Sequence, residues 1–215
     1  MSTPKLTEID DLVREQHCRL SAADQCYFLY EYYAKGGFGA GPGNQVIANL
    51  QKPVSKRGTK EYYYKEQDIN RVATALAANI ALSSEVTVVP MAPSRAKSDP
   101  EYDDRMLQIA QRACRGSGAH AQDLLECKAT RQKLKSSTAP RDPQRIAANL
   151  MVTGAPASAT VILLDDVITT GATFVASKQV LTQAFGGLTI YGVFVARRAI
   201  VVSEPDYYDH FDEDF

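Results

Sequence analysis

The sequence predicts an α/β protein with an open, mostly parallel sheet flanked by helices. Strand-like apolar runs occupy residues 85–90, 161–164 and 188–196, and helix-like segments separate them. Alternating strands and helices are typical of parallel sheets that helices cover on both faces. A chain of 215 residues is long enough for one domain with its own core. We therefore expect one such sheet, with a small hood or an N-terminal helical extension.

Residues 1–65 are predicted to form the N-terminal extension, as a hood or an interface. A helix is expected from Ser21, whose hydroxyl can cap a first turn, to the glycine pair Gly36 and Gly37. The glycine-rich residues 36–44 follow. They lack the lysine and hydroxyl residue of a P-loop, and no obvious strand precedes them, so a plain connection is favoured over a phosphate site.

Residues 66–200 are predicted to form the core of the domain. Apolar side chains recur at helical spacing over residues 66–82, at Ile69, Val72, Leu76 and Ile80, and predict an amphipathic helix. Later elements are expected as a helix from Met106 to Gly116, a short strand at 123–127, and a helix from Thr173 to Gly186. Residues 201–215 hold six acids and no lysine or arginine, which predicts a solvated acidic tail.

Composition excludes several classes of protein. A hydrophobic content of 45%, a charged content of 23% and a net charge of -1 are ordinary for a globular domain and give no indication of a nucleic-acid partner. No apolar run reaches the roughly 18 residues of a membrane span, and no signal peptide is visible, so we expect no membrane association and a cytoplasmic protein. The four cysteines and three histidines show neither zinc-site spacing nor a Ser-His-Asp set.

The stretch VILLDDVITTGAT, residues 161–173, carries the clearest chemistry. Asp165 and Asp166 follow an apolar strand, where parallel sheets bind ligands beyond the carboxyl ends of their strands. The turn after them leads into a helix, whose N–H groups and dipole favour an anion. We expect a phosphate cradle made by Val167, Ile168, Thr169, Thr170, Gly171, Ala172 and Thr173. Carboxylates accept bonds from vicinal hydroxyls and can hold Mg2+, so a sugar phosphate fits this stretch.

These residues resemble a known motif. LLDDVITTGAT is similar to the motif by which type I phosphoribosyltransferases bind phosphoribosyl pyrophosphate (PRPP). VVPMAPSRAK, which ends at Lys97, resembles the loop that holds pyrophosphate in these enzymes, and so implies substrate binding by Ser94, Arg95, Ala96 and Lys97. The likeness covers roughly residues 85–200. The ComF-like branch of the family is most similar, because Thr130, Gln132, Arg145 and Asn149 follow in that branch's order.

The resemblance implies an enzyme that transfers a phosphoribosyl group between pyrophosphate and a nitrogen nucleophile, with Mg2+. Asp165 and Asp166 would hold the ribose hydroxyls and the metal. Family members carry a mobile catalytic loop where this chain has a basic stretch, and from that stretch Arg131 and Lys133 are selected as catalytic residues. The implied partners are PRPP, pyrophosphate and an unidentified nitrogenous acceptor. A homodimer or another protein partner is left open.

The chain also departs from the family pattern. Thr169 stands where enzymes of 6-oxopurine salvage carry an aspartate, which disfavours hypoxanthine or guanine and leaves adenine, orotate, uracil or another acceptor open. Tyrosines at 62–64 or at 207 and 208 are candidates for stacking on a flat base. Cys18 and Cys26 alone do not supply the zinc cluster common in ComF-like chains. The alternative function is a catalytically silent protein that senses PRPP.

Overall fold

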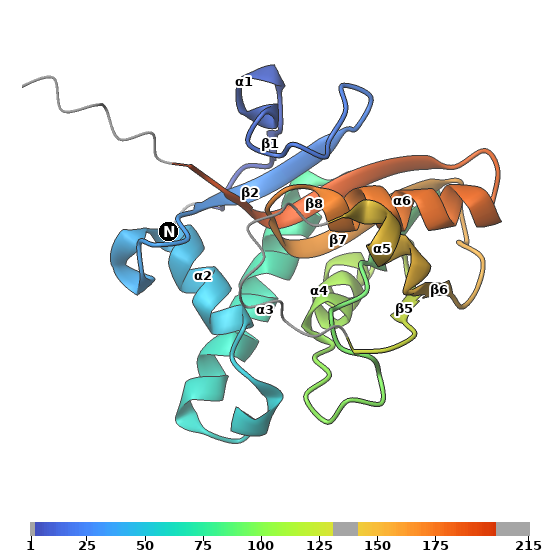
Figure 1. The fold of residues 1–215 in the computed structure, drawn as a ribbon. Helices are drawn as coiled ribbons and strands as arrows, with labels where there is room; N and C mark the ends of the chain where they lie inside the picture. Colours follow the sequence, from blue (N-terminus) through green and yellow to red (C-terminus); the bar gives the residue numbers. More distant parts are fainter. Residues whose placement is uncertain (1–2, 131–141, 201–215) are drawn as a thin grey trace, which may run out of the picture.

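The computed structural model describes residues 3–130 and 142–200. Six strands form one sheet in the order β1-β2-β8-β7-β3-β4, and every neighbouring pair is parallel except β1 with β2 (Figure 1). The strands are β1 (Thr7–Glu8), β2 (Cys26–Tyr32), β3 (Val86–Pro90), β4 (His120–Ala121), β7 (Thr160–Ile168) and β8 (Thr189–Arg198). The predicted α/β architecture with an open, mostly parallel sheet is confirmed.

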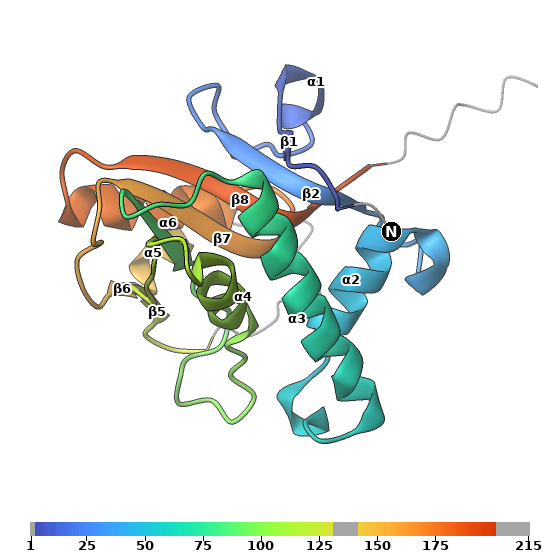
Figure 2. The same cartoon turned by 180° about the vertical axis from the view of Figure 1, so that it is seen from behind.

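Helices cover both faces of this sheet, as Figure 2 shows from behind. One face carries α2 (Pro42–Leu50), α3 (Lys60–Asn79) and α4 (Arg105–Cys114), and the other carries α6 (Ala172–Ala184) with α5 (Pro143–Ala148) beside it. The remaining elements are α1 (Asp11–Arg14), two 3-10 turns (Phe38–Ala40 and Val54–Lys56) and a two-stranded antiparallel sheet of β5 (Leu125–Cys127) with β6 (Leu150–Val152). Within the described ranges no helix is long and apolar enough to span a bilayer.

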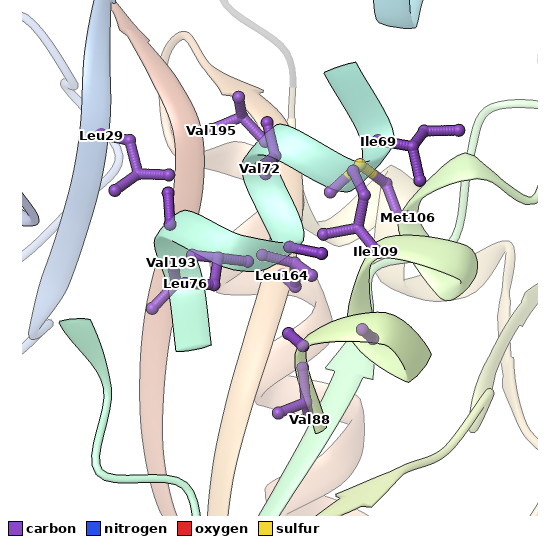
Figure 3. Close-up of a cluster of buried hydrophobic side chains, with 14 of the residues drawn as sticks. Leu29, Ile69, Val72, Leu76, Val88, Met106, Ile109, Leu164, Val193 and Val195 are labelled. Carbon is purple, nitrogen blue, oxygen red and sulfur yellow. The ribbon is translucent and has the colours of Figure 1, made fainter. Parts of the chain in front are cut away.

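The central strand β7 explains the two layers of the core. Side chains alternate across a strand, and β7 is buried on both faces because helices lie on each side. Ile162 and Leu164 join the cluster that α3 and α4 build, which Figure 3 shows around Leu164. Val161 and Leu163 join the cluster under α6. The continuous apolar run that predicted this strand is thus a consequence of double burial.

The helix predicted from Ser21 is wrong. Residues Cys26–Tyr32 form β2, which pairs in parallel with β8 along its whole length. The aromatic side chains of CYFLYEY favour a pleated surface, and the ladder to β8 supplies the long-range hydrogen bonds that a local pattern does not reveal. Ser21 forms a tight turn instead, since both its N–H and its hydroxyl donate to Asp24 at 2.8 Å. The division of the chain at residue 65 stays a prediction, although β2 joins the sheet from before that boundary.

Three element boundaries also differ from the prediction. The glycine-rich residues 36–44 hold the start of α2, and Gly43 lets this helix pack on β2, since a Cβ there would lie 2.0 Å from the Glu31 carbonyl oxygen. The helix predicted at 66–82 begins earlier, at Lys60, where the Thr59 side chain caps the Tyr62 N–H. Strand β7 extends to Ile168, so both aspartates lie within the strand.

Candidate functional site

The chain reverses direction across the sheet between β3 and β7. From β3 it proceeds through α4 to the edge strand β4, and from β7 it proceeds through α6 to β8 on the other side. The helices α4 and α6 lie on opposite faces, which is the arrangement that opens a ligand crevice beyond the carboxyl ends of two neighbouring strands. The Met91 N–H donates to the Leu164 carbonyl at 2.9 Å and holds the two strand ends together. The loops after β3 and β7 therefore share one edge.

The loop after β3 carries the predicted pyrophosphate-binding residues. Ser94, Arg95 and Lys97 are exposed and Ala96 is buried. In this structure the cations pair with the chain's own acids: the Arg95 guanidinium lies 3.0 Å from Asp99, and Lys97 Nζ lies 2.7 Å from Asp123 and 2.6 Å from Glu126. Burial works against the charge of Lys97, but these two carboxylates hold its pKa above the ordinary value. An incoming pyrophosphate would have to exchange partners with them.

Asp166 is a buried carboxylate with every oxygen occupied. Its Oδ2 accepts from Arg105 Nη2 at 2.6 Å and from Gln51 Nε2 at 3.0 Å, and its Oδ1 accepts from the Val167 N–H at 2.7 Å. Burial disfavours the charge, but Arg105 and the hydrogen bond from Gln51 hold the pKa of Asp166 below its usual range. Asp166 is therefore ionised, and each of its oxygens has at least one hydrogen-bond donor inside the protein.

Asp165 lies in a different environment from its neighbour. It is half-buried, and its Oδ1 accepts from the Asp166 N–H at 2.8 Å. Burial and then the charge of Asp166 raise the pKa of Asp165 to about 7. Two adjacent carboxylates thus differ in protonation near neutral pH, as is common where acids share a site.

The raised pKa of Asp165 predicts a pH-dependent stability. In the unfolded chain this carboxyl ionises near pH ~4, and in the folded protein it ionises near pH 7. The folded state therefore binds more protons at this carboxyl between these values, and the contribution of Asp165 to stability should fall as pH rises from ~4 to ~7. Asp165→Asn should lack that decline, so its free energy of unfolding should gain on wild type across the window and run parallel above it. Urea denaturation at each pH, with EDTA present, measures both curves; curves parallel throughout would contradict the prediction.

The predicted phosphate loop is braced by a segment distant in sequence. His17 Nδ1 contacts the Thr169 carbonyl, and the Arg19 N–H donates to the Thr170 carbonyl at 2.9 Å. A carbonyl only accepts, so Nδ1 of His17 carries the proton. Because a trans peptide points its N–H opposite to its C=O, the N–H groups of Thr170 and Gly171 point away from this brace. Both therefore point to the side of the loop opposite His17 and Arg19.

Gly171 is needed for a reason that the sequence did not reveal. It caps α6 with a left-handed backbone, at φ +85°, and a Cβ there would lie 2.7 Å from Leu20 Cδ2. The close approach that the structure shows at this glycine is thus made by Leu20. A bulky substitution would displace the brace before it met any ligand.

The other predicted residues divide into packed and accessible ones. Ile168 and Ala172, the first residue of α6, are buried in the cluster on that face of the sheet, so their side chains belong to the core and only their backbone is available to a ligand. Val167, Thr169, Thr170 and Thr173 are half-buried. Arg131 and Lys133 lie outside the described residues. Sequence reasoning missed Gln51, Arg105, His17 and Leu20.

The acidic pair fits a magnesium ion only in part. Both oxygens of Asp166 are occupied, which leaves Asp165 as the carboxylate of the pair with capacity for a further ligand. Across residues 3–130 and 142–200, no group of three or more His, Cys, Asp or Glu side chains could hold a metal ion. A magnesium ion held by Asp165 would therefore need most of its oxygen ligands from another source.

Comparison with known proteins adds little to this description. No protein-family model and no curated protein matches the chain. A hypoxanthine phosphoribosyltransferase from Staphylococcus aureus is similar among solved structures, with a TM-score of 0.37 and 11% identity over 61% of this chain and 73% of its own. A likeness of that size carries no argument, so the functional case rests on the site.

Proposed function

We propose that this protein binds PRPP and transfers its 5-phosphoribosyl group to a nitrogen nucleophile, releasing pyrophosphate. One observation carries the proposal: the end of β7 holds two aspartates and continues through a braced N–H turn into α6, at the reversal of the sheet. A phosphate would bind the turn, and ribose hydroxyls would meet the acidic pair. The loop after β3, with Arg95 and Lys97, shares the same edge and would meet the diphosphate.

The reaction needs no covalent bond between the protein and the substrate. The bond from ribose C1 to the pyrophosphate oxygen breaks, and its electron pair leaves with pyrophosphate. The lone pair of the acceptor nitrogen then forms the new bond to C1, and the nitrogen loses its proton to water or to pyrophosphate. Carboxylate charge at the acidic pair favours the cationic ribose, and Arg95 and Lys97 stabilise the leaving group. Mg2+, when bound with the diphosphate, would neutralise part of its charge.

A second candidate function is a PRPP sensor without turnover. It is favoured by the ion pairs of Arg95 with Asp99 and of Lys97 with Asp123 and Glu126. Cations already held by neighbouring acids are less available to a leaving pyrophosphate. A sensor needs only binding, whereas an enzyme must stabilise the transition state more than the ground state.

Binding and turnover can be measured separately. We expect calorimetric titration with Mg2+ and PRPP to show binding, and pyrophosphate release to appear with one of a panel of bases that includes adenine, orotate and uracil. Arg95→Gln tests the role of Arg95 in stabilising the leaving pyrophosphate. Its matched control is Arg112→Gln, which alters a pair with Glu66 away from the site. Binding without release from any base would support the sensor. No binding of PRPP would reject both functions.

A further inference from the structure

We propose that Arg105 is a positioning residue that keeps Asp166 inside the protein, so that Asp165 alone of the acidic pair meets the ribose. This inference rests on the proposed function and assigns different roles to two adjacent side chains. It also introduces a residue from α4 into a site that the sequence places after β7.

The contacts of Arg105 identify it as a clamp. Its Nη2 donates to Asp166 Oδ2 at 2.6 Å, and its Nη1 donates to Asp103 Oδ2 at 2.7 Å. The side chains of Arg105 and Asp166 are only 17% and 12% exposed, so solvent weakens this pair little. Hydrogen bonds in which the donor or the acceptor is ionised are about twice as strong as neutral ones. Gln51, from the end of α2, donates a second side-chain hydrogen bond to the same oxygen of Asp166, at 3.0 Å.

The charges around Asp166 decide whether it would leave this clamp for a substrate. Removing one partner of a buried ion pair is strongly destabilising, because the other charge stays buried without compensation. A ribose hydroxyl is an uncharged donor, so it would not replace the positive charge of Arg105 beside Asp166. Asp166 should therefore stay with Arg105 when the substrate binds.

Asp165 has no comparable commitment. In the part of the chain that the structure describes, no ion pair to Asp165 is present, and its hydrogen bonds are to the neighbouring Asp166, whose N–H donates to Oδ1 at 2.8 Å. The side chain is half-buried and so retains access to the edge of the sheet. Turning it toward a hydroxyl breaks no ion pair. Asp165 can therefore bind the ribose at a lower cost in free energy than Asp166.

Four variants of the full chain test the assignment by PRPP affinity and by urea unfolding. They are Asp165→Asn, Asp166→Asn, Arg105→Gln and the double variant of Arg105→Gln with Asp166→Asn. Asp165→Asn should lower affinity at least tenfold without lowering stability. Arg105→Gln should weaken PRPP binding about fivefold in protein that is still folded, because the released Asp166 carboxylate repels an anionic ligand. Adding Asp166→Asn to Arg105→Gln should restore affinity to within about threefold of wild type, since two neutral amides then replace the ion pair. A purely structural Arg105 would show no such rescue.

The outcomes separate this inference from the function on which it rests. If Asp166→Asn alone, and the double variant, lose PRPP affinity as far as Asp165→Asn does while folded, both acids meet the ribose and the assignment is wrong. If Arg105→Gln binds PRPP as wild type does, the clamp has no positioning role. If wild type itself binds no PRPP, the proposed function fails, and the inference fails with it.

Discussion

Replacing Lys65 with methionine is expected to lower the free energy of unfolding by about 3–5 kcal/mol, the usual cost of breaking a buried ion pair. The Lys65 side chain is fully buried, and its Nζ donates to Asp103 at 2.6 Å and to the Lys52 carbonyl at 2.7 Å. Burial lowers the pKa of Lys65, against the attraction of Asp103. Methionine fills a similar volume but leaves an acid and a carbonyl without their donor. Asp103 also holds Arg105, so the loss should extend to the acidic pair.

Lys97→Met is the matched control for this change. Lys97 also contacts two acceptors at short distance, but its side chain is 41% exposed. Exposed ion pairs contribute about 0–1 kcal/mol, since water and salt screen them. Urea denaturation of the two variants should therefore give clearly different losses. Equal losses would mean that burial does not determine how much these lysines contribute to the free energy of unfolding.

The core strands could be predicted where their own residues are continuously apolar. The runs that form β3, β7 and β8 are apolar because helices cover both of their faces, so the residues alone mark them. Strand β2 was not predictable in this way. CYFLYEY combines aromatic and charged residues that suit a helix or a strand locally, and its pairing with β8 lies more than 160 residues away along the chain.

The same distinction applies to the site: its contiguous residues could be predicted from the sequence, and their distant partners could not. Asp165, Asp166 and the loop to Thr173 are contiguous, so a short pattern indicates a strand end, an anion-binding turn and a helix start. Their partners are not contiguous. Arg105 and Gln51 reach Asp166 only because α2 and α4 pack on the same face of the sheet, and nothing in two adjacent aspartates reveals that one is clamped. The different protonation of the pair is a property of packing.

Gly171→Ala is expected to weaken PRPP binding at least tenfold and to lower stability by more than the ~1 kcal/mol usual for a left-handed non-glycine residue. Two costs add at this position: φ is +85°, and the new Cβ would lie 2.7 Å from Leu20 Cδ2. Moving Leu20 also disturbs the brace that takes up the Thr169 and Thr170 carbonyls, and with it the direction of the N–H groups. Binding measured by calorimetry and unfolding in urea report the two effects.

Two further variants separate the backbone cost from the contact. Gly187 has a similar φ of +75° with no atom within 4 Å of an added Cβ, so Gly187→Ala should show the backbone cost alone and leave PRPP affinity unchanged. Leu20→Ala combined with Gly171→Ala removes the overlap and keeps the strained φ. The double variant should therefore lose less stability than the sum of the two single losses. Strictly additive losses would show that Leu20 and Gly171 do not interact. In that case the contact with Leu20 would not set the position of Gly171 at the start of α6.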